Sequence, residues 1–254
     1  MPENRQPTTM AIVLAAGKGT RMESELPKVL VEVGGRPMVR YVIDALRTAG
    51  VGQIVVVIGY RAELVRAELA DVPNLVFVEQ TEQLGTGHAV QVCREQIAAQ
   101  RGPVLVVTGD SPMLQASSVR TLLEEFAARQ SACLLGTVER TDPTGYGRIV
   151  RDANGTFVDI VEEKDASDAQ RAIREVNVST YVFEAEQLLI ALGQLTDQNV
   201  QREYYVTDCP RILRRGGFDV RALPVLQPCE AMSINNLAEL RAVEAELERV
   251  AGGQ

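Results

Sequence analysis

Apolar runs and amphipathic segments alternate along the first half of the chain. Residues 10–16 (MAIVLAA) form an unbroken apolar run closed by Gly17, the pattern of a strand buried on both faces. In residues 37–49 the apolar positions recur at helical spacing and Gly50 follows, which predicts an amphipathic helix. The same patterns predict strands at 53–58, 75–78, 104–107 and 132–138, and helices at 61–70, 87–100 and 117–129, the last capped by Ser117. Strands alternating with helices build a mainly parallel sheet.

The pattern changes after residue 140. Segments 148–151 and 156–161 flank Asp152-Ala153-Asn154-Gly155, in which Asn-Gly is a hairpin turn signal. The remaining pattern predicts strands at 175–183 and 219–225, and helices at 185–192, 207–215 and about 236–250. We therefore expect an α/β, Rossmann-like fold: a mixed, mainly parallel sheet with helices on both faces, plus a small β-hairpin region.

Composition narrows the classes of partner. The chain has 254 residues, 46% hydrophobic and 24% charged, and a net charge of −8. An acidic chain with no Trp and 4% aromatic residues is not expected to bind nucleic acid or an anionic membrane. The single histidine, His88, excludes mechanisms that need two. Four cysteines without a C-x-x-C pair, and a polar start without a signal-peptide core, lead us to expect a cytoplasmic protein.

Candidate chemistry gathers in the loop after the first strand. This loop reads Leu14-Ala15-Ala16-Gly17-Lys18-Gly19-Thr20-Arg21-Met22, with Pro27-Lys28 downstream. Small residues at the carboxyl end of a strand let backbone amides approach a phosphate, and three cations lie nearby in sequence. Met22 replaces the third glycine of a dinucleotide fingerprint, and a Walker A loop is absent. The loop is therefore either a phosphate site of another kind or a tight turn with solvated cations.

Seven motifs in order carry a resemblance to a known family. L-A-A-G-K-G-T-R-M with E-L-P-K-V-L is followed by L-G-T-G-H-A (84–89), T-G-D (108–110), D-P-T-G-Y-G-R-I (142–149), I-V-E-E-K-D-A (160–166), E-Y-Y-V-T-D (203–208) and I-N-N (234–236). The set is similar to the sugar-1-phosphate nucleotidyltransferases. It is most similar to the uridylyltransferase half of the bifunctional bacterial enzymes that make UDP-N-acetylglucosamine. The resemblance extends from Met10 to about Val250.

The resemblance implies a reaction and a set of charged residues. The phosphate of N-acetylglucosamine 1-phosphate would attack the α-phosphorus of UTP, and pyrophosphate would leave. Because the nucleophile is already an anion, catalysis would consist mainly of positioning and charge neutralisation. By resemblance, Arg21 and Lys28 would contact the phosphates. Asp110 and Asn235 would hold Mg²⁺, which prefers oxygen ligands and keeps several waters.

The resemblance also implies the residues that bind each substrate. The nucleotide would be bound by Leu14, Ala15, Ala16, Gly17, Gly19, Gln80, Gln83, Gly85 and Thr86. The sugar would be bound by Gly147, Glu162, Asn177, Tyr205 and Thr207. Gln80 would read uracil, since an amide offers both a donor and an acceptor, whereas His88 receives no catalytic role.

These assignments imply an organisation of the chain. We expect a tail at 1–9 and a nucleotidyltransferase domain at 10–230. Its nucleotide-binding part would cover about 10–138 and its sugar-binding part about 139–230. A metal-ligand segment with the terminal helix would occupy 231–254.

The sequence departs from the family in three places. Asn177-Val178-Ser179 stands where the family commonly has N-T-G, so a side chain replaces a glycine near the sugar. Around Asn235 the flanking glycine and arginine are Ser233 and Leu237. The bifunctional enzymes continue into a β-helix acetyltransferase domain, so we expect no acetyltransferase activity from this chain.

Several readings of the function stay open at this point. The enzyme could transfer a uridylyl or thymidylyl group to another sugar 1-phosphate. The chain could also be a non-catalytic module that binds nucleotide sugars. A dinucleotide-dependent oxidoreductase is disfavoured by the failed fingerprint, and the oligomeric state stays open.

Overall fold

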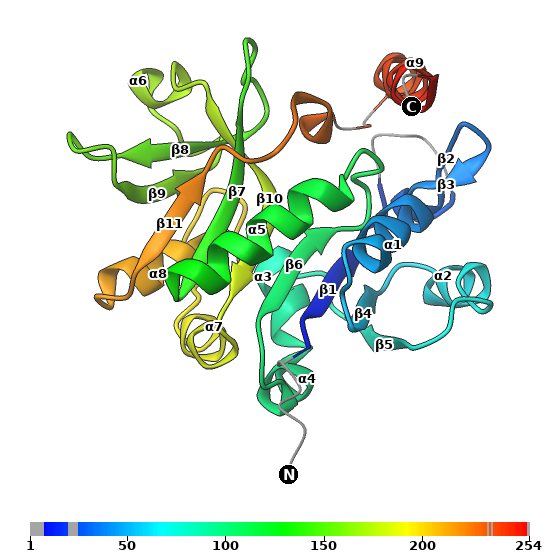
Figure 1. Cartoon of the computed structure of the whole chain (residues 1–254), viewed down its shortest axis with the longest axis horizontal. Coiled ribbons are helices and arrows are strands. Elements are labelled where there is room, and N and C mark those ends of the chain that lie inside the picture. Colours follow the sequence, from blue (N-terminus) through cyan, green and yellow to red (C-terminus); the bar gives the residue numbers. More distant parts are fainter. Residues whose placement is uncertain (1–7, 20–24, 233, 235, 253–254) are drawn as a thin grey trace.

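A mixed nine-stranded sheet forms the centre of the molecule (Figure 1). The computed structural model describes residues 8–19, 25–232, 234 and 236–252. The main path runs β11-β7-β10-β6-β1-β4-β5. Its strands are β1 (Met10–Ala15), β4 (Gln53–Ile58), β5 (Leu75–Glu79), β6 (Val104–Thr108), β7 (Cys133–Glu139), β10 (Glu175–Phe183) and β11 (Val220–Leu223). Neighbours on this path are parallel except where β10 pairs with β6 and β7, which confirms the expected fold class.

Helices cover both faces of the sheet because the central strands are apolar on both sides. Alternate residues of β1 enter different cores: Ile12 packs in one, and Val13 in the other. The first core lies under α3 (Thr86–Gln91), α4 (Arg94–Ala99), α7 (Ala185–Leu192) and α8 (Asp208–Arg215). The second lies under α1 (Met38–Thr48), α2 (Ala62–Glu68) and α5 (Ala116–Arg129), and α1 and α5 cross one face in Figure 1.

A β-hairpin extends the sheet beyond its main path. It consists of β8 (Gly147–Arg151) and β9 (Phe157–Val161), as the sequence predicts. In its turn the Asp152 carboxylate accepts hydrogen bonds from the amides of Asn154 and Thr156, both at 2.9 Å. β8 pairs with β10, and this pairing sets Gly147 opposite Asn177. The hairpin therefore lies beside β10, on the left in Figure 1.

Two predictions about helices are wrong. The helix expected at 87–100 is two helices, α3 and α4, because the amide of Cys93 bonds the carbonyl three residues back, at Val90. Ser117 is not a cap: α5 begins at Ala116, and the amide of Gln115 before it donates to Glu230 at 3.0 Å. A distant carboxylate thus takes the place of a local cap.

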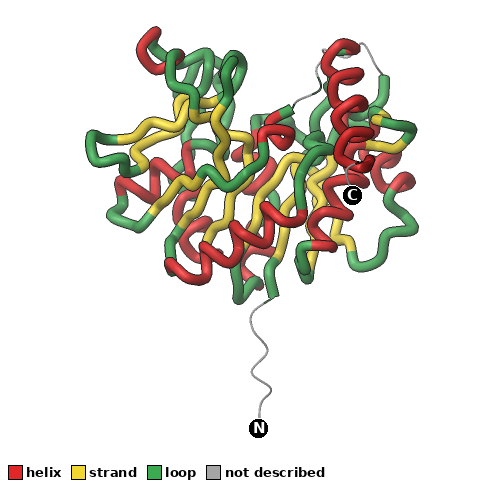
Figure 2. The backbone as a smooth tube through the Cα atoms, turned by 45° about the horizontal axis from the view of Figure 1, so that its top comes forward, coloured by secondary structure: helices red, strands yellow, loops and turns green. Residues whose placement is uncertain are grey.

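Short elements that the pattern does not reveal complete the chain. They are the 3-10 helices η2 (Lys28–Leu30) and η3 (Pro228–Ala231), the small strands β2 (Glu32–Val33) and β3 (Arg36–Pro37), and α6 (Asp168–Arg171). The terminal helix α9 (Leu237–Gly252) contacts β2, and Figures 1 and 2 show it at the same end as the β2–β3 hairpin. Among the described residues, no helix has the length and apolar character that crossing a membrane requires.

One buried carboxylate connects the C-terminal segment to the sheet layers. Glu230, in η3, also accepts hydrogen bonds from the Ser118 hydroxyl at 2.5 Å and the Gln227 amide at 2.7 Å. Its side chain is buried, and burial raises its pKa. This carboxylate joins η3 to the start of α5.

Candidate active site

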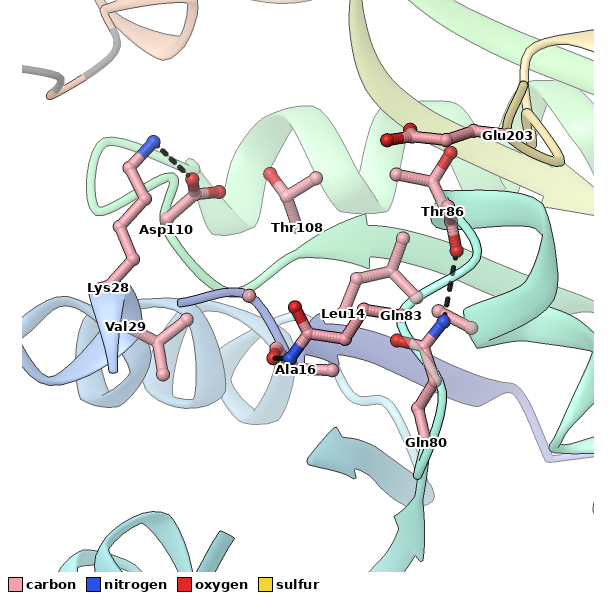
Figure 3. A pocket seen from close by; sticks show the side chains of 13 residues that line it. Leu14, Ala16, Lys28, Val29, Gln80, Gln83, Thr86, Thr108, Asp110 and Glu203 are labelled. Atoms are coloured by element: carbon pink, nitrogen blue, oxygen red, sulfur yellow. Dashed lines mark hydrogen bonds and ion pairs between the residues drawn. The ribbon is translucent and has the colours of Figure 1, made fainter. Parts of the chain in front are cut away.

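The carboxyl ends of β1 and β6 open onto a cavity of about 280 Å³ (Figure 3). In open α/β sheets this edge is where ligands bind. After the predicted nucleotide-binding residues that line it, we call it the nucleotide cavity. It is lined by Leu14, Ala16, Gly17, Lys28, Val29, Gln80, Gln83, Gly85, Thr86, Ala89, Thr108, Asp110 and Glu203. The structure thus brings together predicted residues from four separate stretches of the chain.

One end of this cavity carries an ion pair. Lys28 Nζ lies 2.7 Å from Asp110 Oδ2, and both side chains are partly exposed (Figure 3). The Lys28 amide also bonds the Gly17 carbonyl at 3.4 Å, which holds Lys28 near the end of β1. Thr108 and Ser111, whose hydroxyls are 2.7 Å apart, fix the turn that carries Asp110. A cation and an anion at one cavity edge can receive a phosphate and a metal ion respectively.

Two residues predicted to bind nucleotide do not line the cavity. The side chain of Ala15 is buried in the core under α1, because side chains alternate along β1. Gly19 has φ +69°, and a Cβ there would come within 2.7 Å of the Lys28 Cβ. Gly19 therefore makes room for Lys28 rather than forming a wall. Arg21, predicted to contact phosphates, lies outside the described residues.

The opposite end of the nucleotide cavity is built around the amide of Gln80. Gln80 is buried, and its Nε2 donates to the Gly85 carbonyl at 3.1 Å. The same nitrogen lies 3.1 Å from His88 Nδ1. Both amide hydrogens are then used within the protein, and among the described residues no donor bonds Oε1, which leaves it as an acceptor. His88 thus orients Gln80, a positioning role that the sequence did not suggest.

Two further cavities adjoin the first one. The smaller, about 190 Å³, is lined by Thr108, Asp110, Ser111, Gly145, Tyr146, Gly147, Glu162, Asn177, Val178, Ser179, Glu230, Ala231 and Met232. The larger, about 310 Å³, is lined by Thr86, Gly145, Glu162, Glu163, Lys164, Ser179, Gln201, Glu203, Tyr205, Val206 and Thr207. After the predicted sugar-binding residues, we call these two the sugar cavities. Each predicted sugar-binding residue lines at least one of them, and each cavity shares residues with the nucleotide cavity.

Glu162 is the carboxylate that both sugar cavities share. Its Oε1 accepts a hydrogen bond from the Thr207 hydroxyl at 3.0 Å. Burial raises its pKa, the Thr207 hydrogen bond opposes that rise, and the nearby Asp165 and Asp208 add to it. Opposite it, a Cβ on Gly147 would lie 3.6 Å from Glu162 Oε1 and only 3.0 Å from a methyl of Ile160. The absence of a side chain at Gly147 keeps this space open.

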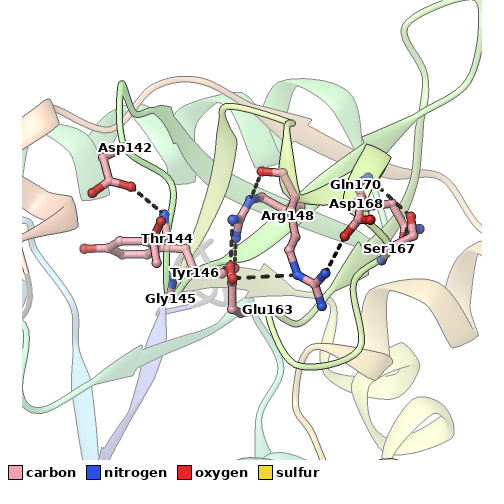
Figure 4. Close-up of polar contacts among 10 residues, drawn as sticks. Asp142, Thr144, Gly145, Tyr146, Arg148, Glu163, Ser167, Asp168 and Gln170 are labelled. Atoms are coloured by element: carbon pink, nitrogen blue, oxygen red, sulfur yellow. Dashed lines mark hydrogen bonds and ion pairs between the residues drawn. The ribbon is translucent and has the colours of Figure 1, made fainter.

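An ion pair between Glu163, the residue after Glu162, and Arg148 supports the wall of the sugar cavities (Figure 4). Arg148, whose side chain is 2% exposed, lies 2.7 Å from Glu163 Oε2 and donates to the Tyr146 carbonyl. Glu163 Oε2 also accepts from the Gly145 amide at 3.3 Å. Desolvation raises the pKa of Glu163, but the hydrogen bonds from Arg148 and the Gly145 amide outweigh it, so the pKa is lowered. Both acids line the larger sugar cavity, but Glu163 is bonded to Arg148 and to the Gly145 amide and so supports residues 145–148, whereas Glu162 lines both sugar cavities.

The chemistry around Asp110 suits a hard cation. Asp110 lines both the nucleotide cavity and the smaller sugar cavity; its carboxylate is paired with the Lys28 ammonium, and the hydroxyl residues Thr108 and Ser111 line the same space. Among the described residues, no three His, Cys, Asp or Glu side chains gather as a metal site. Mg²⁺ needs no such cage, because one carboxylate with substrate oxygens and water suffices. The second predicted ligand, Asn235, lies outside the described residues.

Comparison with known proteins places this site in a family. The family profile described as the MobA-like NTP transferase domain matches residues 11–179, which include the nucleotide cavity's strands and the β8–β9 hairpin. The chain belongs to this family. It is therefore a nucleotidyltransferase, and the resemblance seen in the sequence motifs is confirmed.

Curated relatives of this NTP transferase domain are named bifunctional protein GlmU. The chain is 44% identical over 94% of its length to the protein from Pelotomaculum thermopropionicum, and 40% identical over 95% to that from Streptococcus mutans serotype c. In both cases it spans 52% of the relative, about half. A solved structure, UDP-glucose pyrophosphorylase complexed with UDP-glucose, aligns over 96% of this chain and 99% of its own. Its TM-score of 0.75 at 15% identity shows a shared fold.

Replacing Glu163 tests the support of the sugar-cavity wall. Glu163→Gln leaves Arg148 buried without its carboxylate, so we expect the free energy of unfolding at pH 7 to fall by about 2 kcal/mol. The pKa of Glu163 is lowered in the folded state, so its contribution is present above its unfolded pKa and disappears as pH falls through the folded value. The difference between variant and parent in chemical denaturation should therefore vanish in acid.

The exposed pair of Glu125 and Arg129 in α5 supplies the matched control. Glu125→Gln should leave the free energy of unfolding nearly unchanged, because exposed pairs contribute little. Equal losses of stability in the Glu163→Gln and Glu125→Gln variants, independent of pH, would contradict the support role of Glu163.

Proposed function

We propose that the chain transfers a uridylyl group from UTP to N-acetylglucosamine 1-phosphate, with the assistance of Mg²⁺. The observation that carries this proposal is that the nucleotide cavity meets the smaller sugar cavity at Asp110 and the larger one at Glu203. The products would be UDP-N-acetylglucosamine and pyrophosphate. A structural neighbour solved with UDP-glucose is consistent with a nucleotide sugar as the product class.

Selection of the base follows from the orientation of the Gln80 amide. Its free Oε1 is an acceptor, and N3 of uracil carries a hydrogen that it can accept. The N3 of cytosine is itself an acceptor, so the same group would face an unpaired lone pair. Because Gln80 is buried, such a mismatch would not be relieved easily by water. This geometry favours UTP over CTP.

The charged end of the nucleotide cavity would receive the triphosphate. Asp110 would hold Mg²⁺, and the ion when bound would neutralise charge on the phosphates. Lys28 would then leave Asp110 and pair with a phosphate oxygen, since its present partner would be occupied. A phosphate oxygen of the sugar attacks the α-phosphorus, the bond to the β-phosphate's bridging oxygen breaks, and pyrophosphate carries away the charge. No proton moves, so no general base is required.

The sugar would lie against Gly147, Glu162 and Asn177. Glu162 presents acceptor oxygens to the sugar hydroxyls, and Thr207 holds one of those oxygens in place at 3.0 Å. Tyr205 is buried in the wall of the larger cavity. With the sugar phosphate in the smaller sugar cavity and UTP in the nucleotide cavity, the phosphate of the sugar and the triphosphate would lie together beside Asp110.

Pyrophosphate release tests this function directly. We expect release from UTP with N-acetylglucosamine 1-phosphate in Mg²⁺ to exceed release from dTTP or CTP, and to exceed release with glucose 1-phosphate. Asp110→Asn should lower kcat about a hundredfold or more, because a charged ligand of the ion is lost. Asp71→Asn, an exposed acid paired with Arg40, should change kcat less than about twofold. Binding of UTP without turnover would contradict the assignment as an enzyme, and faster use of glucose 1-phosphate would contradict the acetamido sugar.

Substitution of Gln80 tests the base contact. Gln80→Ala should lower the ratio of kcat/KM for UTP to that for CTP about tenfold, because one discriminating hydrogen bond is lost. His88→Ala should lower the same ratio by a smaller factor, because the Gln80 amide group could then rotate and exchange its oxygen and nitrogen. Gln91→Ala is the control, because Gln91 donates to the Leu192 carbonyl outside the cavity. An unaltered ratio in the Gln80 variant means that another group reads the base.

A further inference from the structure

The residues that follow β4 contact the loop that follows β1. The two strands are parallel neighbours, so both segments leave the same edge of the sheet (Figure 1). The Tyr60 amide donates to the Ala16 carbonyl at 3.1 Å. A Cβ on Gly59 would come within 2.9 Å of the Ala16 Cβ, so the glycine permits this close approach. Main-chain contact therefore joins the two segments where they leave the sheet.

Two side chains after β4 contact the same loop at further points. The Lys18 ammonium nitrogen lies 5.3 Å from the centre of the Tyr60 ring, within the range of a cation–π contact. The Arg61 guanidinium donates to the Glu25 carbonyl at 2.9 Å, and the Tyr60 hydroxyl donates to the same oxygen at 3.4 Å. The Glu25 carboxylate lies 3.8 Å from the guanidinium. The chain is thus held at residues 16–18 and again at Glu25.

Both of these points adjoin the charged end of the nucleotide cavity. Ala16 and Gly17 line that cavity, and so does Lys28, three residues after Glu25. The Lys28 amide bonds the Gly17 carbonyl at 3.4 Å, which connects the two points. The two side chains after β4 are not among the described residues that line the cavity. They can act on a ligand there only through the chain that they hold.

Arg61 occupies a backbone conformation that glycine would adopt at lower cost. Its φ and ψ are both +48°, in the left-handed region that a Cβ makes unfavourable, at the residue before α2. Its side chain is 40% exposed, so burial in the core does not account for an arginine here. What glycine would lose is the contact with Glu25. Strained residues of this kind cluster at functional sites, which directs attention to that contact.

We propose that Tyr60 and Arg61 are positioning residues, which hold the loop after β1 in the arrangement that binds the triphosphate of UTP. The proposal rests on the proposed function and adds to it two residues outside the cavity. Without their contacts, part of the binding free energy of UTP would be spent on ordering the loop, so affinity would fall. The sugar cavities are lined by other segments, so binding of the sugar phosphate should not change.

Two substitutions of Arg61 separate its contact from its backbone conformation. Arg61→Ala removes the guanidinium and keeps the strained Cβ, whereas Arg61→Gly removes both. We expect either variant to raise the Kd of UTP in Mg²⁺, measured by calorimetry without sugar phosphate, about three- to tenfold. KM for UTP should rise with it, while kcat and KM for N-acetylglucosamine 1-phosphate should change less than about twofold. The Tm of the Gly variant should exceed that of the Ala variant by about 2 to 4 °C, so weaker binding would not reflect lower stability.

Two substitutions of Tyr60 separate its ring from its hydroxyl. Tyr60→Ala removes the ring beside Lys18 and should raise the Kd of UTP about two- to fivefold. Tyr60→Phe keeps the ring and loses only the long hydrogen bond to Glu25, so it should raise the Kd less. Equal losses in the two variants would overturn the positioning role of the ring.

Arg66→Ala is the matched control. Arg66 lies in the same helix, α2, and makes the same kinds of contact with β5: its guanidinium is 5.1 Å from the centre of the Phe77 ring and 3.9 Å from Glu79. This variant should keep the parent Kd for UTP. An equal loss in the Arg61 and Arg66 variants would overturn the proposal, as would an equal rise of KM for both substrates in the Arg61 variants.

The binding measurement distinguishes this proposal from the proposed function. If the Arg61 variants bind UTP as the parent does, the positioning role is overturned, while pyrophosphate release by the parent still supports the proposed function. If the parent binds UTP but releases no pyrophosphate with any sugar 1-phosphate, the proposed function is overturned. Weaker UTP binding by the Arg61 variants would in that case still support the positioning role.

Discussion

The register between β1 and β6 is the constraint on which the site depends. It pairs Leu14 with Thr108, and the Gly109 amide continues the pairing by bonding the Leu14 carbonyl at 2.9 Å. The loops that follow the two strands therefore leave the sheet side by side. This places Asp110 opposite Lys28 at 2.7 Å, although the two are far apart in sequence. A shift of one residue would turn every side chain to the other face and separate the pair.

A second set of backbone contacts joins the nucleotide cavity to the sugar cavities. The Gly87 amide bonds the Tyr204 carbonyl at 2.7 Å, and the Tyr204 amide bonds the Leu84 carbonyl at 2.8 Å. The hydroxyl of Thr86 accepts from the Val206 amide at 3.1 Å. Gly85 is needed here, since a Cβ would come within 2.6 Å of the Tyr204 carbonyl oxygen. The base-reading and sugar-binding segments are thus fixed relative to each other by the main chain.

The parts of the fold that sequence predicts are those governed by local pattern. β1 and β6 are unbroken apolar runs and could be placed directly, and the motifs around Gln80 and Asp110 indicated the family. The cap of α5 could not be predicted, because its role is taken by Glu230, 112 residues from Ser118. The different roles of Glu162 and Glu163 depend on the buried Arg148, which pairs with Glu163. The orientation of the Gln80 amide depends on its contact with His88. Such features need contacts that no spacing along the chain reveals.

The most direct test of this account is a crystal structure of the chain grown with UTP and Mg²⁺. The account predicts the triphosphate against Gly17 and Lys28, the ion on Asp110, and N3 of the uracil within hydrogen-bond distance of Gln80 Oε1. The ion pair between Lys28 and Asp110 should be broken in that complex. Nucleotide bound instead in the cavity of about 600 Å³ beside Pro103 and Phe218, with the ion pair intact, would contradict the account.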